Sequence, residues 1–275
     1  MLVKEFRVVL PLTVDEYRVG QLYSVAKTSS QETSNGEGVE VLINEPYKNE
    51  EEGHEGQFTH KIYHLGSRLP GWIRALIPSS ALKLEERAWN AYPYCKTVLK
   101  SPFLGDSFTF IIESRHAQDN GSTENIHNLS AKDLKSRDLE VIDITNDVDK
   151  KEYKAEEDPT LVKSEKANRG PLKKGEWMNS QDHPVMCCYK LVTVEFKWFG
   201  FQTKVENFMM KIEKDLFTKF HRQVYCWLDD WFGMSMEDVR AYELKVKEDL
   251  KKKIEDGQKG EKGDKEKEEK PEKTK

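Results

Sequence analysis

The chain has 275 residues, of which 37% are hydrophobic and 34% are charged, and its formal net charge is -5. This composition is typical of a soluble globular protein, and the length allows one domain or two. A negative net charge provides no basic field for nucleic acid, so we expect no nucleic-acid partner. We also expect no signal peptide and no membrane span, because no apolar run reaches the length that either requires. The four cysteines lack metal-ligand spacing and are interpreted as free thiols in a reducing compartment.

The first elements in chain order are a strand and a helix. Residues 4–10 alternate apolar and polar side chains, which predicts a strand. Residues 13–26 predict a helix, because Thr13 and Glu16 stand at the spacing of a capping box. Further strands are predicted at residues 39–44, 57–64, 92–99, 107–114, 140–143 and 185–198. Together these segments predict a sheet that we interpret as an antiparallel meander.

The second half of the chain adds a loop, a long helix and a tail. Residues 147–183 are polar and contain Pro159, Gly170 and Pro171, which predicts a long loop with little regular structure. Apolar residues recur every three or four positions over residues 206–232 and predict an amphipathic helix. A helix of this length after a large sheet predicts an α+β fold, with a cavity between a concave sheet and the helix. The tail after residue 257 has no apolar side chain and is predicted to be disordered.

Catalytic signatures are missing from the sequence. It contains no phosphate-binding GxxxxGK[ST] loop, no HExxH motif and no GxSxG elbow. The two closest histidines, His60 and His64, would share one face of a strand, but a third metal ligand would have to come from elsewhere. We therefore expect no enzyme activity, no metal and no cofactor.

Several polar residues stand in phase with the apolar faces of the predicted strands. Lys190 shares the phase of Val192 and Val194, and Ser114 shares that of Phe110. Thr97 likewise shares a face with Cys95, and Thr59 with Lys61. These residues could be edge lysines reaching water and hydroxyls bonded to the backbone. Alternatively, lysines and hydroxyls around one apolar chamber would suit a phosphate attached to an apolar molecule.

The segment at residues 69–78 is strongly apolar, bounded by prolines and too short to span a bilayer. It could be a core helix, or a lid that inserts Trp72, Ile73, Leu76 and Ile77 into a membrane interface. A second aromatic group, around Trp198 and Phe199, stands at a strand end. There, core packing and membrane contact both remain open.

The segments VLPLTVDEYRVGQLYSVA, VEVLINEPY, QFTHKIYHL, WNAYPYC, YKAEEDP, NRGPL, CYKLVTVEFKW and FHRQ resemble the phosphatidylinositol transfer proteins, in order from about residue 4 to 243. The resemblance is to the small, single-domain, soluble class. It implies a START-like α+β fold, in which a concave antiparallel sheet and two long helices enclose a lipid cavity. We expect this domain to span residues 1–256, with a regulatory loop at about 147–184 and a charged tail at 257–275.

The same resemblance assigns roles to individual residues. Inositol contacts fall on Thr59, Lys61, Asn90 and Glu243, and phosphate contacts fall on Gln21, Thr97, Ser114 and Lys190. Cys95 lies near the head group, and Ser164 matches a phosphorylated serine of the regulatory loop, although its neighbours Glu165 and Asn168 depart from the family pattern. A lipid-exchange loop and a membrane-docking pair fall on Trp72, Ile73, Leu76, Ile77, Pro78, Trp198 and Phe199. Phe199 stands where relatives usually carry tryptophan, and Ser114 where they carry threonine.

The function implied by the resemblance is lipid transport. The chain would bind one phosphatidylinositol or phosphatidylcholine molecule and transfer it between membranes, supporting phosphoinositide supply. We expect a cytoplasmic monomer that contacts membranes transiently, with the nucleus as a further location. Two alternatives remain open at this point: an interaction or scaffold protein that keeps its bound lipid, and a lipid-modifying enzyme.

Overall fold

The computed structural model describes residues 1–32, 39–49, 53–65, 69–75, 77–78 and 81–249. The predicted lid residue Leu76 and the predicted tail at 257–275 lie outside the described residues. The described strands are β1 (Leu2–Leu10), β2 (Val39–Asn49), β3 (His54–His64), β4 (Lys83–Ala91), β5 (Tyr94–Lys100), β6 (Phe108–Ala117), β7 (Asp138–Asp143) and β8 (Met186–Phe196). The helices are α1 (Val14–Glu32), α2 (Gly71–Arg74), α3 (Ala131–Ser136), α4 (Gln202–Cys226) and α5 (Leu228–Trp231), and residues 236–249 are also helical.

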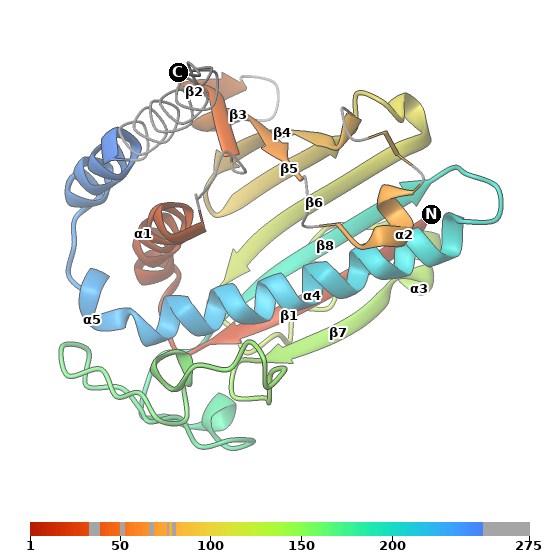
Figure 1. The fold of residues 1–275 in the computed structure, drawn as a ribbon. Coiled ribbons are helices and arrows are strands. Elements are labelled where there is room, and N and C mark those ends of the chain that lie inside the picture. The colour runs from red at the N-terminus through yellow and green to blue at the C-terminus, as the bar shows by residue number, and fades with distance from the viewer. Residues whose placement is uncertain (33–38, 50–52, 66–68, 76, 79–80, 250–275) are drawn as a thin grey trace, which may run out of the picture.

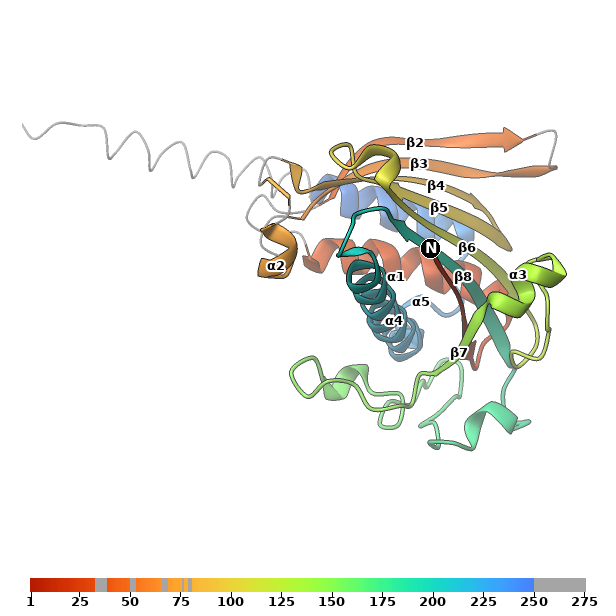
Figure 2. The ribbon, with the colours of Figure 1, turned by 90° about the vertical axis from the view of Figure 1, so that its right-hand side faces the viewer.

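The eight strands form one sheet in the order β2-β3-β4-β5-β6-β8-β1-β7. Figure 1 shows α4 crossing the strands near β8 and β1, and Figure 2 shows the sheet curving around α1 and α4. The fold is therefore α+β with a concave sheet, as the sequence and the family resemblance predicted. Among the described helices, none combines the length and the hydropathy needed to cross a bilayer.

One strand pair differs from the predicted antiparallel meander. β7 runs parallel to β1, with Lys4 opposite Asp138 and Val9 opposite Asp143. β6 also runs parallel to β1, because each of them is antiparallel to β8. The chain therefore reaches β7 by a crossover through residues 118–137, which contain α3, and a parallel strand requires a crossover of this kind.

Both faces of the sheet centre are buried. Phe6, Val8 and Leu10 are fully buried, and so is Val9, whose side chain points to the opposite face. The convex face is covered at this point by the segment at Gly121, which lies beside Val9 and Cys187. Cys187 and Cys188 are adjacent on β8 and both completely buried, one on each face. All four cysteines are free, as predicted.

Two predicted helices differ from the observed ones in their limits. α1 begins with the predicted capping box, because the Thr13 hydroxyl accepts from the Glu16 backbone N–H and Glu16 accepts from the Thr13 N–H, and it continues beyond the predicted end to Glu32. The predicted helix at 206–232 begins at Gln202 and is interrupted at Trp227. The indole N–H of Trp231 donates to the Val224 carbonyl. In a continuous helix this carbonyl would accept from the backbone N–H of Leu228.

The predicted long loop is present. Between β7 and β8 the regular structure is limited to the short 3-10 turns Ala155–Glu157 and Trp177–Asn179 and one isolated antiparallel bridge between Ser164 and Arg169. The loop is nevertheless tied to the domain, because Arg169 makes a bidentate pair with Glu16 at 2.8 Å and the Trp177 indole donates to Asp143. These contacts hold the loop against α1 and the end of β7.

Candidate functional site

A cavity of about 940 Å³ lies between the sheet, α1 and the helix at 236–249. Strands β2 to β5 supply one wall, and the two helices supply the other. Its apolar lining includes Leu22, Val25, Ala88 and Val246. Its volume is at the upper end of those typical of small-molecule sites, and the lining combines apolar surface with a few polar groups, as such sites do.

Most residues that the family resemblance assigned to a lipid head group line this cavity. They come from five elements: α1, β3, β4, β5 and the helix at 236–249. The lining members are Gln21, Thr59, Lys61, Asn90, Cys95, Thr97 and Glu243. The predicted contacts Ser114 and Lys190 do not line the cavity itself, and they lie on the next strands of the sheet.

The register of the sheet explains how these distant residues reach one place. Neighbouring strands pair Asn90 with Cys95, Cys95 with Ser114, and Ser114 with Lys190. Residues opposite one another in neighbouring strands project from the same face of a sheet. Lys190 and Ser114 therefore continue a polar row that begins at the cavity wall.

Lys190 stands at the inner end of this row. Its ammonium lies 3.5 Å from the Ser114 hydroxyl and 4.8 Å from the centroid of the Phe217 ring. Within the described residues, no carboxylate oxygen lies within ion-pair distance of it. Burial raises the pKa of the Cys95 thiol to about 11, although the Lys190 ammonium acts in the opposite direction, so Cys95 is a neutral thiol near neutral pH. The row therefore presents a cation, a hydroxyl and a thiol to the interior.

Two buried polar atoms of the cavity lack partners. Gln21 Oε1 and Thr59 Oγ1 are both inaccessible and make no hydrogen bond with the described protein atoms. Buried polar groups in proteins are nearly always hydrogen-bonded, so unpaired atoms at a cavity wall indicate a polar ligand. Both residues belong to the predicted head-group set, and they fit a ligand that carries hydroxyl or phosphate oxygens.

A sequence model of the family described as phosphatidylinositol transfer protein matches residues 1–248. The chain belongs to this family. It is 80% identical over 257 residues to phosphatidylinositol transfer protein 1 of Dictyostelium discoideum, covering 93% of this chain and 97% of the relative. It is also 51% identical over 255 residues to the human beta isoform, covering 91% and 93% of the two chains. The recognised family is thereby confirmed.

The predicted lid lies against α4 rather than along the cavity wall. Trp72 in α2 makes an edge contact with Phe208 at 5.6 Å, and the Lys204 ammonium lies 4.2 Å above its ring. Ile73 is buried, whereas Pro78 is exposed and Ile77 is half-buried. The short helix therefore rests on the N-terminal part of α4 through apolar and cation–π contacts.

The predicted docking pair Trp198 and Phe199 lies between β8 and α4. Phe199 is fully exposed, and Trp198 is 36% exposed and stacks on Phe196 at 6.0 Å. Figure 1 shows α2 beside the N-terminal part of α4, close to the turn that carries this pair. Phe199 is therefore exposed at the turn, whereas Trp198 packs on the core residue Phe196.

Ser164 is buried in the long loop, with 2% of its surface exposed. Its hydroxyl donates to Asp229 in α5, and the same carboxylate accepts the backbone N–H groups of Glu165 and Lys166. The hydrogen bond from Ser164 holds the pKa of Asp229 below its ordinary value. The predicted phosphorylation site is therefore part of a contact between the loop and α5.

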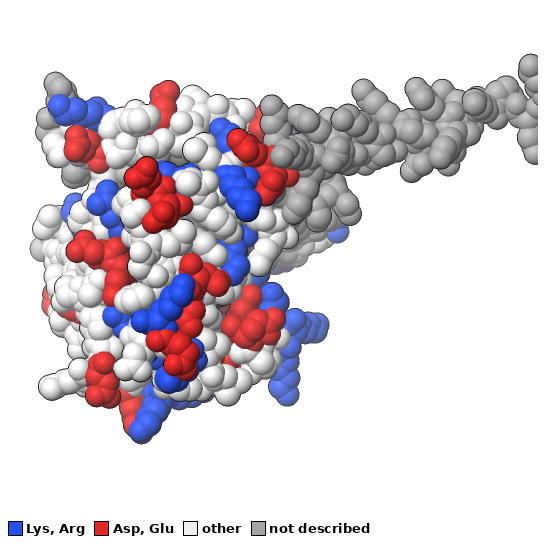
Figure 3. All heavy atoms as spheres, turned by 90° about the vertical axis from the view of Figure 1, so that its left-hand side faces the viewer, with Lys and Arg blue, Asp and Glu red and all other residues white. Residues whose placement is uncertain are grey.

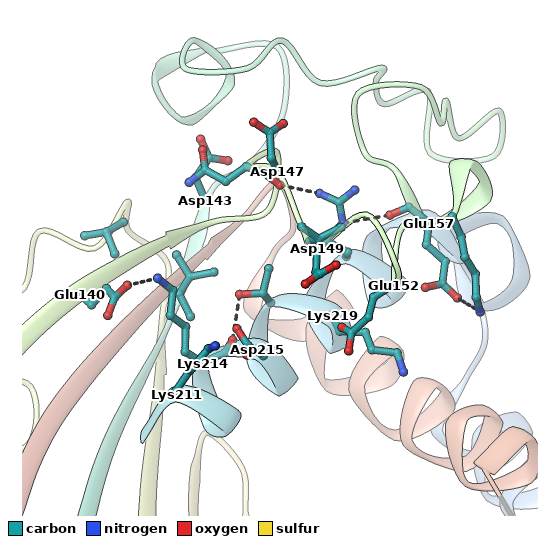
Figure 4. Close-up of a pocket in the computed structure, with 17 residues that line it drawn as sticks. Glu140, Asp143, Asp147, Asp149, Glu152, Glu157, Lys211, Lys214, Asp215 and Lys219 are labelled. Atoms are coloured by element: carbon teal, nitrogen blue, oxygen red, sulfur yellow. Dashed lines mark hydrogen bonds and ion pairs between the residues drawn. The ribbon is translucent and has the colours of Figure 1, made fainter. Parts of the chain in front are cut away.

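A second groove, of about 580 Å³, lies between β7, the outer side of α4 and the loop after β7. Figure 4 shows that charged side chains of both signs surround it, including Glu140, Asp149, Lys211 and Asp215. Lys214 pairs with Glu140, and Arg222 donates to the carbonyl of Ile144. A groove so rich in charges remains hydrated and cannot shield acyl chains.

Charges are also mixed on the outer face around α1. Figure 3 shows acidic and basic side chains interspersed over this face of the molecule. A nucleic-acid interface would need basic residues gathered on one face. The face drawn there has no such gathering among its described residues.

Three inward-facing residues were missed by the sequence analysis. Glu86 and Tyr63 line the cavity, and Glu213 lies on the face of α4 that also carries Met210 and Phe217. Burial raises the pKa of Glu213 to about 7, with Lys190 lowering it and Glu86 raising it. Glu213 could have been noticed as an acid inside the apolar stripe of the helix. Glu86 could not, because β4 itself was not predicted.

Proposed function

We propose that the chain encloses one phosphatidylinositol or phosphatidylcholine molecule and transfers it between membranes. The head group occupies the polar row, with the inositol ring near Thr59, Lys61, Asn90 and Glu243. The phosphate lies near Gln21, Thr97, Ser114 and Lys190, and the acyl chains follow the apolar surfaces of the interior. Members of this family are lipid carriers rather than enzymes, in agreement with the absence of catalytic motifs from the sequence.

One observation carries this proposal. Gln21 and Thr59, whose Oε1 and Oγ1 atoms have no hydrogen-bond partner among the described residues, line a cavity that Lys61 also lines, and the register joins that cavity to Lys190. A ligand with hydroxyls at one end and a phosphate at the other would satisfy all these groups. Phosphatidylcholine has no inositol hydroxyls, so its binding depends mainly on the phosphate contacts.

The free energy of lipid hydration explains why a carrier is needed. Each CH₂ group exposed to water costs about 0.8 kcal/mol, so a free diacyl lipid hardly leaves a membrane. A protein that shields both chains removes most of this barrier. Specificity then depends on the head group, since a ligand without matching hydroxyls leaves buried polar groups unpaired.

Membrane contact is assigned to two described segments. Phe199 and Trp198 insert at the interface, and the α2 segment with Trp72 and Ile73 moves away from α4 to open the interior. Aromatic side chains favour the membrane interface, which suits this role. The protein acts as a cytoplasmic monomer that visits membranes, and Ser164 is a regulatory phosphorylation site.

Transfer between vesicles tests the proposed function. Purified protein is mixed with donor vesicles containing labelled phosphatidylinositol or phosphatidylcholine and with unlabelled acceptor vesicles. A carrier moves both labels in proportion to protein concentration. A scaffold would retain its lipid when acceptor vesicles are added, and a lipid-modifying enzyme would convert it. Either of these results would contradict the proposal.

A further inference from the structure

Lys61 and Glu86 form a part-buried ion pair at the proposed inositol end of the cavity. Lys61 on β3 lies directly opposite Glu86 on β4, and its ammonium donates to Glu86 Oε1 at 2.9 Å. Tyr63, two residues along β3 on the same face, donates its hydroxyl to Glu86 Oε2 at 2.8 Å. Glu86 is 9% exposed. One buried carboxylate is thus held at both oxygens by neighbours on the adjacent strand.

This arrangement fixes the position of the Lys61 ammonium. A lysine ammonium has three N–H donors, and the bond to Glu86 uses one of them. The other two remain for ligand oxygens. A free lysine side chain samples many rotamers, so a fixed partner lowers the entropy lost when ligand binds.

The two lysines of the site differ in charge balance. Lys61 is paired with Glu86, and Arg240, which also lines the cavity, is paired with Glu243 at 2.7 Å. Lys190 has no described carboxylate within ion-pair distance. The Lys61 end therefore offers directed hydrogen bonds with little net charge, whereas the Lys190 end offers a cation whose charge is not neutralised by a direct partner.

We propose that Glu86, held by Tyr63, is a positioning residue that makes the Lys61 end of the cavity select an uncharged, hydroxyl-rich ring over a phosphate group. The inference rests on the proposed function. Without the Glu86 charge, the Lys61 ammonium would be unbalanced and would favour an anionic substituent. With the Glu86 charge in place, a phosphate on the ring would meet a carboxylate of the same sign, whose oxygens already accept hydrogen bonds from Lys61 and Tyr63.

The variant Glu86→Gln tests this assignment because it keeps the shape and removes the charge. Transfer of phosphatidylinositol, of phosphatidylinositol 4-phosphate and of phosphatidylcholine is measured between vesicles. We expect the ratio of the phosphorylated to the unphosphorylated inositol lipid to rise about tenfold. Tyr63→Phe, which removes one hydrogen bond, should shift the ratio in the same direction by less.

Glu85→Gln is the matched control. Glu85 is the neighbour of Glu86 on β4 and points to the other face, where it accepts from Arg87. This substitution should leave the relative transfer of the three lipids unchanged. A structural defect at β4 would lower transfer of every lipid together, and that result, or an unchanged ratio in folded Glu86→Gln, would overturn the inference.

A double-mutant cycle separates positioning from a direct role. In a Lys61→Ala background, Glu86→Gln should cause little further change in the ratio, because its effect acts through Lys61. Additive effects would show that Glu86 acts independently of Lys61, and would overturn the inference. If the unsubstituted protein transfers neither phosphatidylinositol nor phosphatidylcholine, the proposed function itself fails. If it transfers both and the ratio is unchanged in Glu86→Gln, only the role of Glu86 fails.

Discussion

The hydroxyl of Ser164 lies 2.5 Å from Oδ1 of Asp229, and this contact joins the long loop to α5. Two backbone N–H groups from the loop bind the same carboxylate. A kinase needs an accessible serine, and Ser164 is buried, so the loop must open locally before modification. A phosphate at this position would then stand against a carboxylate and keep the loop apart from α5.

A Ser164→Glu substitution should therefore loosen the loop. Like charges at this distance repel, and we expect proteolysis within residues 147–184 to become several-fold faster. Limited proteolysis followed by mass spectrometry measures the effect. Ser122→Glu, at an exposed serine, serves as the control. Equal cleavage rates in the two variants would show that the Ser164 contact does not hold the loop.

Head-group contacts should separate the two lipids. We expect Lys61→Ala or Thr59→Glu to lower the ratio of phosphatidylinositol to phosphatidylcholine transfer at least about tenfold, since only the inositol ring needs these groups. Lys96→Ala is the matched control, because Lys96 lies on the opposite face of β5, near Glu113. Equal loss of both lipids in the two head-group variants would remove the inositol assignment.

The exposed aromatic pair should govern membrane contact rather than lipid binding. Trp198→Ala should slow transfer and weaken binding to vesicles, while the lipid content of the protein stays the same. Phe199→Trp should strengthen vesicle binding, because indole rings favour the interface more than phenyl rings do. Vesicle flotation and extraction of bound lipid measure the two quantities. Unchanged flotation in both variants would be incompatible with a docking role.

Glu213 predicts a pH dependence of stability. Its pKa is raised from the ordinary 4.5 to about 7, so its contribution to stability is full below pH 4.5 and is lost as the pH rises through 7. Glu213→Gln should remove this loss and raise the free energy of unfolding at pH 8 by on the order of 1–2 kcal/mol, after allowance for solvent screening of a half-buried group. Urea unfolding at pH 5 and pH 8 measures it. In the exposed Glu237→Gln variant, the free energy of unfolding should change between pH 5 and pH 8 as it does in the unsubstituted protein. The same change in Glu213→Gln would refute the assignment.

Local sequence patterns predicted much of the fold because the relevant forces are local. Alternation identified β1, β3, β6 and β8, and the capping box between Thr13 and Glu16 identified the start of α1. β4 was missed because its sequence KLEERAWNA carries charges on both faces, and only the structure shows that Glu86 is paired inside the domain. The interruption at Trp227 depends on a bond from the Trp231 side chain, which no periodicity reveals.

The candidate site was predictable in part. Phase alone placed Lys190 and Ser114 on an inward face, but their meeting with Cys95 and Asn90 depends on register across four strands. Register is set by turns and irregularities, such as the shift between Val41 and Ile43 on β2, that local patterns do not determine. The inositol itself came from the family resemblance, since hydroxyls and lysines on a strand do not identify a ring.

Native mass spectrometry of the purified protein, after incubation with vesicles that contain several lipids, tests the central claim most directly. The account predicts one bound phospholipid per chain, drawn from phosphatidylinositol and phosphatidylcholine, and its replacement when vesicles with isotopically labelled lipids are added. A protein that emerges without bound lipid, or that keeps its first lipid unchanged in the presence of labelled vesicles, would contradict the account.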